Sequence, residues 1–583
     1  MKKKIMPILF IGGIIILALG IILVSVLVKK YTPNKETFSL SEYYNITSEE
    51  QVATVLNQTN VDAKAKMIDG KVYLDYHFVH DYINARFYWD ANENILLYTT
   101  DRDLISAQAD SNTYTITKST NDWDCAIVKA SSDSAYINID FVKQYSDFTY
   151  EYFESPNRLV INTQWGEVST ASIKKNTDVR LKGGIKSPIL TKVSKKDSVT
   201  IIEAYDKWTK IITADGIIGF VKNNTLSDAT TVKLENADYK PEEFTHILKD
   251  EKISMAWHQV TNTSSNNDIA NVLAGTKGIN VMSPTWFYLN DNKGNLHDIA
   301  STNYVNYCHS QGVDVWALFS NLENKEVDTS YVLTHTSTRH NLVNQIIAAA
   351  IQYNLDGINL DFEAIDTSVG DAYIQFVREL SIKCANNGII LSVDNYVPTS
   401  YTAFYNRAEQ ANFADYVVIM GYDQHTLGDE AGSVASINWV KDGVINTLES
   451  VPAEQVILGM PFYTRIWELT PSDTENVDVA DEQEYKVTSS TFGMKAAANS
   501  LANNNATATW SEEDGQNYAQ WTNGGTIYKV WLEDSASIEE KLKLVDSYSL
   551  AGAAYWKLGF ETSNIWDTII KYIYLYFYSF YLF

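Results

Sequence analysis

The sequence has few cysteines and few basic residues, and each shortage excludes a class of protein. Its 583 residues include only three cysteines, Cys125, Cys308 and Cys384, which lie far apart. An odd number of scattered cysteines supplies neither a disulfide framework nor a cysteine-rich zinc site. Lysine and arginine total 46 against 72 aspartates and glutamates, which gives a formal net charge of −26. Because nucleic acids and anionic lipid headgroups attract lysine and arginine, we expect neither as a partner.

Several catalytic motifs are also missing. The sequence contains no Gly-x-Ser-x-Gly, no His-Glu-x-x-His and no Walker-type loop, so serine hydrolases, zinc proteases and P-loop enzymes have no support. The chain is nevertheless 45% hydrophobic, which excludes wholesale disorder. At about 150 residues per domain, its length predicts three or four folded domains.

The N-terminus carries the longest apolar run. Residues 5–28 contain no charge and lie between two lysine clusters. As a helix, this run would reach about 36 Å, enough to cross a hydrocarbon core of roughly 30 Å. A cleaved signal peptide is the alternative, but its apolar region is usually only about 7–15 residues long. We therefore expect residues 1–31 to be a cytoplasmic tip and a single-pass cell-membrane anchor, with the rest of the chain outside the cytoplasm.

A weak repeat follows the apolar run. Residues 72–79, Val-Tyr-Leu-Asp-Tyr-His-Phe-Val, are echoed by residues 135–142, Ala-Tyr-Ile-Asn-Ile-Asp-Phe-Val. Each copy predicts a strand, a short helix and two further strands. The pattern resembles the copper amine oxidase N-terminal-like module of bacterial surface proteins, which we place at residues 39–165 as a small α+β module. The histidine pair of the first copy, His77 and His80, is not repeated in the second, so we expect no copper site.

Residues 170–227 change to short strands separated by polar turns. They resemble a bacterial SH3-like β-barrel. That family often binds peptidoglycan stem peptides, but it also serves as a passive spacer, and both roles stay open here. The polar residues 228–246, which include Pro241, are predicted to form a linker.

From residue 247 to residue 570, apolar strand-like runs alternate with helical runs. The predicted strands are residues 253–257, 279–286, 313–319, 357–363, 389–395, 416–422, 456–461 and 552–556. Apolar strands that alternate with helices indicate a parallel sheet covered on both sides. Eight such units predict a (β/α)8 TIM barrel, with an α+β insertion at about 467–534. The uncharged aromatic tail, 571–583, is either an interfacial anchor or accidental sequence, and we assign it no function.

The fourth predicted strand of the barrel is acidic. Strand alternation places Asn359, Asp361 and Glu363 on one face, which points into a barrel. Glu363 comes last and therefore lies at the rim where barrel enzymes carry out their chemistry. Neighbouring carboxylates repel each other, so one should hold a proton near neutral pH. The strand thus predicts a general acid beside an anion.

Four motifs, in the chain order that the family has, resemble those of glycoside hydrolase family 18. The acidic strand, Asp-Gly-x-Asn-x-Asp-x-Glu at 356–363, is similar to that family's fourth-strand signature and to its bacterial spore and cell-wall N-acetylglucosaminidase branch. Met-Gly-Tyr-Asp at 420–423, Pro-Phe-Tyr-Thr-Arg at 461–465 and Tyr-Trp at 555–556 resemble its sixth-, seventh- and eighth-strand motifs. Asn359 departs from the usual aspartate and shortens the carboxylate relay to Asp361 and Glu363.

The resemblance implies a retaining mechanism in which the acetamide of the substrate is the nucleophile. Glu363 would be the general acid and base, Asp361 would orient the acetamide, and Tyr422 would hydrogen-bond its oxygen. It also implies substrate-binding residues, an apolar floor from Trp556 and polar or lining contacts from Asn359, Asp356, Met420, Asp423 and Arg465. No metal and no cofactor is implied.

These features favour a membrane-anchored extracytoplasmic hydrolase that cuts β-1,4 linkages of N-acetylglucosamine-containing cell-wall glycan. A chitinase or an endo-β-N-acetylglucosaminidase is the alternative enzyme. A non-catalytic sugar-binding lectin on the same barrel is the alternative from another class, although such lectins commonly lose the acid that Glu363 supplies.

Overall fold

The computed structural model describes residues 2–132, 134–471 and 485–573. The chain divides into two compact units. One comprises Met1–Trp89, Ala107–Tyr114 and Thr120–Pro241, and the other Asp90–Ser106, Thr115–Ser119 and Glu242–Phe583. Most of the predicted aromatic tail, residues 574–583, lies outside the described residues.

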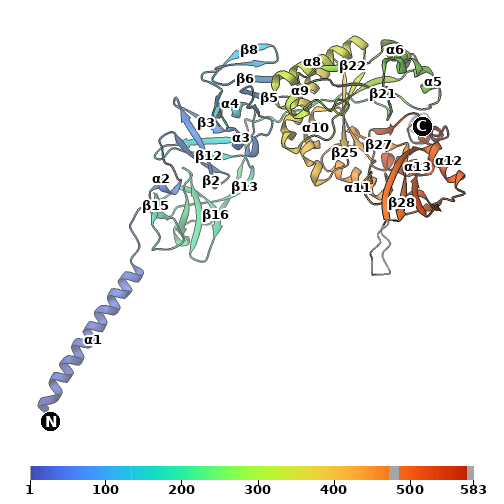
Figure 1. Ribbon diagram of the computed structural model, residues 1–583. Helices are drawn as coiled ribbons and strands as arrows, with labels where there is room; N and C mark the ends of the chain where they lie inside the picture. The colour runs from blue at the N-terminus through green and yellow to red at the C-terminus, as the bar shows by residue number, and fades with distance from the viewer. Residues whose placement is uncertain (1, 133, 472–484, 574–583) are drawn as a thin grey trace, which may run out of the picture. The chain divides into compact units, whose positions relative to one another are not determined.

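The apolar N-terminal run is one long helix, α1 (Lys2–Tyr31) (Figure 1). Its segment Leu9–Tyr31 has a mean hydropathy of 3.0, and none of it is buried. By length and composition this helix could cross a membrane, and a signal sequence would meet the same criterion.

The predicted repeat is confirmed. In the first copy, β3 (Lys71–Asp75) leads into α3 (Tyr76–Tyr82), then β4 (Tyr88–Asp90) and β5 (Ile95–Thr99). In the second copy, β10 (Ala135–Asn138) leads into α4 (Ile139–Gln144), then β11 (Thr149–Phe153) and β12 (Arg158–Asn162). The residue before each helix, Asp75 or Asn138, caps it by accepting backbone N–H groups of the first turn.

Two sheets complete this β-rich module. The strands β11-β12-β1-β2-β3-β10-β9 form one, and β4-β5-β6-β7-β8 form the other. The further strands are β1 (Gln51–Leu56), β2 (Thr59–Ile68), β6 (Leu104–Gln108), β7 (Thr113–Ile116), β8 (Ser119–Asp122) and β9 (Val128–Ala130), and a short helix, α2 (Leu40–Tyr43), precedes them.

The strands predicted within residues 170–227 are present, but their sheet is larger than predicted. It runs β15-β14-β18-β17-β16-β13-β19. Its strands are β13 (Gly166–Ser172), β14 (Thr177–Arg180), β15 (Ile189–Val193), β16 (Ser198–Ala204), β17 (Trp208–Thr213), β18 (Ile218–Lys222) and β19 (Thr230–Leu234). The prediction that residues 228–246 form only a linker is wrong at its start. Antiparallel hydrogen bonding to β13 turns this polar stretch into strand β19.

Eight parallel strands form a closed barrel. In chain order they are β20 (Ile253–His258), β21 (Val281–Leu289), β23 (Asp314–Ser320), β24 (Gly357–Asp361), β25 (Ile390–Tyr396), β26 (Tyr416–Met420), β27 (Val456–Pro461) and β33 (Gly552–Trp556). The barrel closes because β20 pairs with both β21 and β33. Strand β22 (Leu296–Asp298) adds to β21 in antiparallel orientation. All eight predicted barrel strands are confirmed.

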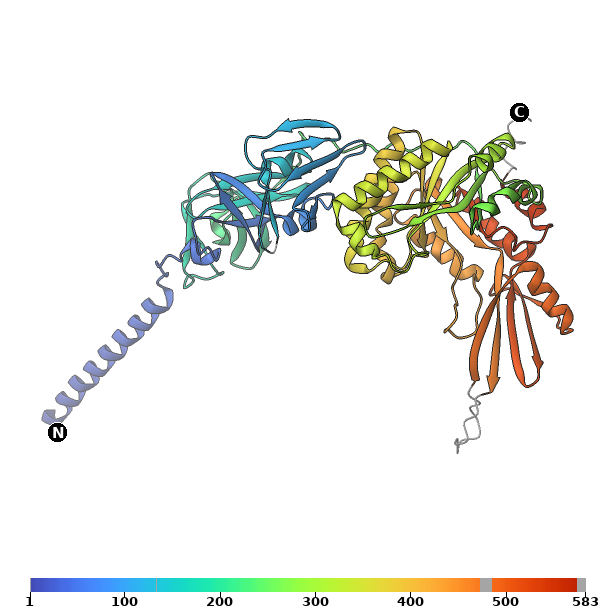
Figure 2. The same ribbon diagram turned by 45° about the horizontal axis from the view of Figure 1, so that its top comes forward.

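Helices cover the outside of these strands, as Figure 2 shows. They are α5 (Ile269–Ala274), α6 (Thr302–Ser310), α7 (Thr329–Thr334), α8 (Thr336–Tyr353), α9 (Gly370–Asn386), α10 (Arg407–Phe413), α11 (Ile437–Leu448), α13 (Ser535–Ser547) and α14 (Ile565–Ile573). Helices such as α9 and α13 bury apolar side chains and contact the strands, as a sheet covered on both sides requires.

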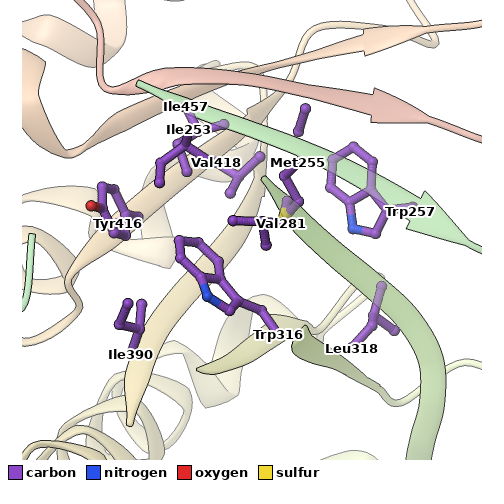
Figure 3. Packing of buried hydrophobic residues seen from close by; sticks show 11 residues of the cluster. Ile253, Met255, Trp257, Val281, Trp316, Leu318, Ile390, Tyr416, Val418 and Ile457 are labelled. Atoms are coloured by element: carbon purple, nitrogen blue, oxygen red, sulfur yellow. The ribbon is translucent and has the colours of Figure 1, made fainter. Parts of the chain in front are cut away.

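The barrel interior is filled by large apolar side chains (Figure 3). Trp316 stacks on Tyr416 with their rings 5.4 Å apart, and both are buried. Gly357 allows this packing, because a Cβ there would lie 2.8 Å from the Trp316 ring. Side chains therefore fill the barrel interior here, and a substrate can be bound only at the strand ends.

The predicted α+β insertion is present in the described residues. It has a sheet in the order β29-β28-β32-β31-β30 and one helix, α12 (Met494–Asn503). The strands are β28 (Tyr463–Pro471), β29 (Tyr485–Gly493), β30 (Thr509–Ser511), β31 (Gln516–Asn523) and β32 (Thr526–Leu532). Ile466, Ala519 and Val530 on the sheet and Leu501 on the helix give the insertion a small core of its own.

Candidate active site

A cavity of about 160 Å³ lies at the C-terminal ends of the barrel strands. It is lined by Trp257, Asp361, Glu363, Asp394, Tyr396, Met420, Tyr422, Asp423 and Trp556. The structure therefore brings together the three residues predicted to be catalytic, Glu363, Asp361 and Tyr422. Met420, Asp423 and Trp556 of the predicted substrate-binding set also line the cavity.

The other predicted site residues lie away from the cavity surface. Asn359 is fully buried beneath it. Arg465 lies behind Asp423, with 3.9 Å between its Nη2 and the carboxylate. Asp356 precedes β24 at the opposite end of the barrel, where it accepts hydrogen bonds from His309 and from the backbone N–H of Val315. The structure does not bring Asp356 to the site.

Glu363 follows β24 and is held from its backbone. Asn321 donates from Nδ2 to the Glu363 carbonyl at 2.9 Å and accepts from the Glu363 N–H at 2.9 Å. The next residue, Ala364, has φ 51°, a left-handed conformation that is strained for alanine. Its N–H donates to the Tyr396 hydroxyl at 3.2 Å. Backbone strain of this kind is typical of functional sites.

The electrostatic environment suits Glu363 to act as an acid. Burial raises the pKa of the Glu363 carboxyl, a hydrogen bond from Tyr396 partly opposes this, and the negative charges of Asp423 and Glu323 raise it further. Burial, followed by Asp394, Glu363 and Glu323, raises the pKa of Asp361 well above its ordinary value. One Asp361 oxygen, Oδ1, is buried without a hydrogen-bond partner in the described part of the chain.

Asp394 is a third carboxyl of the cavity, and the sequence analysis did not predict it. It lies on β25, is only 3% exposed, and its Oδ1 accepts a hydrogen bond from Asn359 Nδ2 at 2.7 Å. Burial raises the pKa of Asp394 well above its ordinary value. The sequence did carry a signal, because Ser392, Asp394 and Tyr396 alternate along a strand predicted to be buried on both faces.

Aromatic rings form one wall of the cavity. Trp257 contacts Trp556 edge to face at 5.7 Å between ring centroids, and Tyr422 at 6.5 Å. Burial raises the pKa of Tyr422 well above its ordinary value, so its hydroxyl keeps its proton. Three other tryptophans, Trp286, Trp316 and Trp467, are fully buried and belong to the core.

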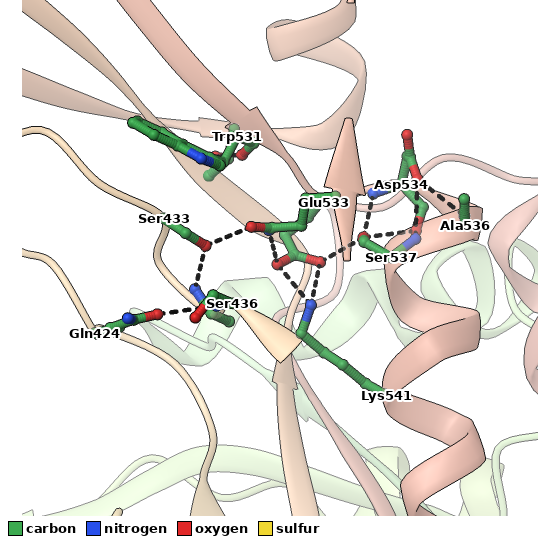
Figure 4. A network of polar contacts seen from close by, with 12 residues as sticks. Gln424, Ser433, Ser436, Trp531, Glu533, Asp534, Ala536, Ser537 and Lys541 are labelled. Atoms are coloured by element: carbon green, nitrogen blue, oxygen red, sulfur yellow. Dashed lines mark hydrogen bonds and ion pairs between the residues drawn. The ribbon is translucent and has the colours of Figure 1, made fainter. Parts of the chain in front are cut away.

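The loop after β26, which carries Tyr422 and Asp423, is fixed from behind. Asp423 has φ 62° and accepts a hydrogen bond of 2.6 Å from the Tyr463 hydroxyl. Further along the loop, Ser433 donates to Gln516 on β31. Gln516 in turn donates to the buried Glu533 at 2.6 Å, and Lys541 on α13 pairs with the same carboxylate at 3.0 Å (Figure 4). This network joins the site loop to the insertion and to a barrel helix.

Comparisons with known proteins agree with this architecture. The model of the glycosyl hydrolases family 18 matches residues 217–561, and the model of the copper amine oxidase N-terminal domain matches residues 55–161. Neither of these two family models describes an SH3-like domain at residues 170–227.

Two curated relatives from Bacillus subtilis match part of the chain. An uncharacterized glycosylase, YvbX, is 26% identical over 294 residues, 48% of this chain and 81% of its own length. A cortical fragment-lytic enzyme is 26% identical over 278 residues, 46% of this chain and 61% of its own length, so the chain spans less than two thirds of that relative. Among solved structures, the Bacillus cereus spore cortex-lytic enzyme SleL is 20% identical with a TM-score of 0.49, covering 57% of this chain and 76% of its own.

The family model spans more than half of the 583 residues. It includes every barrel strand, the acidic strand and the residues that line the cavity. The chain therefore belongs to glycosyl hydrolases family 18 and is an O-glycosyl hydrolase.

Proposed function

We propose that this protein is a membrane-anchored, extracytoplasmic glycosidase that cleaves β-1,4 linkages of N-acetylglucosamine-containing cell-wall glycan, with peptidoglycan as its substrate. The observation that carries the proposal is the cavity in which Glu363, with a raised pKa, lies beside Asp361, Tyr422 and Trp556. Hydrolysis of an acetamido sugar needs a protonated carboxyl, a second carboxyl beside it, a hydroxyl donor and an apolar wall.

The mechanism begins with Glu363 as the general acid. It gives its proton to the glycosidic oxygen, while the acetamide oxygen of the substrate attacks the anomeric carbon and the glycosidic bond breaks. The resulting oxazolinium ion is positive, and the acidic cluster stabilises it. Glu363, now a carboxylate, then takes a proton from water as the water oxygen attacks the anomeric carbon. Two displacements at this carbon give overall retention.

Three cavity residues would position the acetamide. The unpartnered Oδ1 of Asp361 is a free acceptor for the acetamide N–H. The Tyr422 hydroxyl would donate to the acetamide oxygen and aim it at the anomeric carbon. Trp556 would pack beneath the sugar ring as an apolar floor.

The remaining predicted binding residues take different parts. Met420 and Asp423 line the cavity and would contact the sugar, and Arg465 would act through Asp423. Asn359 supports the floor from below. The chemistry of this site uses no metal or cofactor.

The cell-wall assignment and the anchor rest on other features. A curated relative is named for lysis of cortical fragments, which supports a wall glycan as the substrate. Helix α1 supports a single-pass anchor with the barrel outside the cytoplasm. We propose the domain limits 1–31 for the tip and anchor, 39–165 for the copper amine oxidase N-terminal-like module, 170–227 for an SH3-like domain extended by its flanking strands, and 247–570 for the catalytic barrel.

The test compares the full chain in mild detergent with Glu363→Gln and with the control Glu326→Gln, which changes an exposed glutamate that does not line the cavity. Each is incubated with purified peptidoglycan, a chitin oligosaccharide and an N-glycan, and products are reduced with borohydride and read by mass spectrometry. We expect fragments that end in reduced N-acetylglucosamine from peptidoglycan, present with the control and absent with Glu363→Gln.

Other outcomes would change the assignment. Cleavage of the chitin oligosaccharide or the N-glycan alone would make the protein a chitinase or an endo-β-N-acetylglucosaminidase. If the wild type and both variants bind these glycans and cleave none of them, the protein is a lectin and the role given to Glu363 is wrong.

A further inference from the structure

The buried amide of Asn359 has a defined orientation. Trp257 Nε1, which can only donate, lies 2.8 Å from one end of the Asn359 amide, so that end is the oxygen. The Ser283 hydroxyl donates to the same oxygen at 3.1 Å. The NH₂ group therefore faces β25, where it donates to Ser392 at 3.0 Å and to Asp394 at 2.7 Å.

This arrangement pairs one amide with one carboxylate across two adjacent strands. An aspartate at position 359 would accept from Trp257 and Ser283 equally well. Its second oxygen, however, would then face Asp394 at about the 2.7 Å that separates the two groups now. Two carboxylates at that distance need a shared proton. Asn359 and Asp394 therefore complement each other, and the acid that is missing from β24 is present on β25.

The charge balance around Asp394 is also unusual. Asp361, Glu363 and Asp394 all line one cavity, and none of the ion pairs within the described residues involves them. The acids nearest to them from neighbouring elements are Glu323 after β23 and Asp423 after β26.

The other titratable groups that face Asp394 are tyrosines. The charge of Asp394 acts on Tyr422 after β26 and on Tyr373 of α9. Burial raises the pKa of both phenols, so both remain neutral. Carboxylates that share a cavity without a counter-charge do not ionise independently.

We propose that Asp394 replaces the carboxylate that Asn359 lacks and is a positioning residue that sets how many protons Asp361 and Glu363 share. It acts through its charge and through the hydrogen bond from Asn359, and it does not touch the scissile bond. The inference rests on the proposed function only in that glycoside hydrolysis supplies one of its two readouts.

The sign of the effect follows from the mechanism. Activity requires a protonated Glu363, so the rate falls as pH rises through the pKa of that carboxyl. Asp394→Asn keeps an acceptor oxygen for Asn359 but removes an ionisable group that repels the charges of Asp361 and Glu363, so the acid cluster gives up its catalytic proton at a lower pH. We expect the alkaline limb of the kcat/KM profile to move to lower pH by about half a unit or more.

Three further variants complete the test. Asn359→Asp adds an acid and should move the limb to higher pH. The exchange Asn359→Asp with Asp394→Asn should return it toward the wild-type position. Ser392→Ala is the matched control, because it removes a neighbouring hydrogen bond to Asn359 without removing a charge. Profiles are measured on the full chain with a fluorogenic N-acetylglucosamine oligosaccharide.

A second readout needs no substrate. Acids whose pKa is raised in the folded state destabilise it as pH increases from their unfolded values through their folded ones. The midpoint of the barrel's thermal unfolding should therefore fall less between pH 4 and pH 8 in Asp394→Asn than in the wild type, and more in Asn359→Asp. Limbs and midpoints that move no more than in Ser392→Ala would overturn the proposal. A wild type that cleaves no glycan, but whose variants show these midpoint shifts, would contradict the proposed function and leave the acid cluster standing.

Discussion

Asn321 holds the backbone of Glu363 from both sides. Its side-chain amide donates to the Glu363 carbonyl and accepts from the Glu363 N–H, each at 2.9 Å. Glu363 lies beyond the end of strand β24. These two hydrogen bonds from Asn321 therefore replace the ladder hydrogen bonds that a strand would have supplied to its backbone. The position of the proposed acid therefore depends on a residue of the neighbouring strand end.

Removing this pair should misplace the acid. We expect Asn321→Ala to lower kcat by about 10- to 100-fold with a smaller change in KM, because small displacements of a catalytic group are costly. Asn324→Ala is the matched control, since Asn324 lies in the same loop and likewise donates to one backbone carbonyl, of Asn290, and accepts from one backbone N–H, of Glu326. Steady-state kinetics on one glycan substrate check both. Equal losses in the two variants would show that the loop, and not the contact with Glu363, matters.

Tyr396 should tune the pKa of Glu363 in the opposite direction to Asp394. Its hydrogen bond stabilises the ionised carboxylate and so lowers the pKa of Glu363. Tyr396→Phe removes this bond, and the acid stays protonated to a higher pH. We expect the alkaline limb of the pH–rate profile to move up by about half a unit to one unit. A limb that is unchanged or moves down would contradict this assignment.

Trp556 should contribute to substrate binding far more than to folding. Its side chain is partly exposed in the cavity and packs edge to face on Trp257. Trp556→Ala should lower kcat/KM by about 10- to 100-fold, because the apolar surface that a large side chain buries against the sugar contributes about 1.5–3 kcal/mol. Trp510→Ala, at an exposed tryptophan of the insertion, is the control and should leave kcat/KM unchanged. A similar loss in both variants would indicate a general effect on folding.

The barrel was predictable because its signal is local. Each strand is an apolar run of five to nine residues between helical segments, and Asp361 and Glu363 follow from alternation within one such run. Asn321 follows strand β23, and Asp394 and Tyr396 lie on β25, so these residues are 32 to 42 positions away in sequence from the residues to which they hydrogen-bond. Only the register between parallel strands brings them to the acid, and one sequence does not reveal that register.

The same reasoning explains the other errors. Thr230–Leu234 is almost wholly exposed, so no alternation of buried apolar residues marks it as a strand, and its structure comes from pairing with β13. Asp356 belongs to the acidic motif in the sequence, yet it precedes β24 and so lies one strand length from the rim. Membership in a motif does not place a side chain at the site when the motif runs through the whole strand.

The buried pair between Glu533 and Lys541 should stabilise the contact between the insertion and the barrel helix α13. Both side chains are fully buried, and Gln516 and Ser537 also donate to the carboxylate. Burial raises the pKa of Glu533, and Lys541 opposes this. Lys541→Met would leave an uncompensated buried carboxylate, so the free energy of unfolding should fall by about 3–5 kcal/mol at neutral pH.

The pH dependence of that loss separates charge from packing. Without Lys541 the pKa of Glu533 rises further, so the penalty is present above this pKa and is relieved as the acid protonates at lower pH. The deficit of Lys541→Met should therefore shrink toward pH 4, and Glu533→Gln combined with Lys541→Met should remove most of it at pH 7. Lys543→Met breaks an exposed pair with Glu540 on the same helix and should cost less than about 1 kcal/mol. Denaturant unfolding followed through the tryptophan fluorescence checks all three variants, and a deficit that is independent of pH would mean that lost packing, and not the buried charge, is responsible.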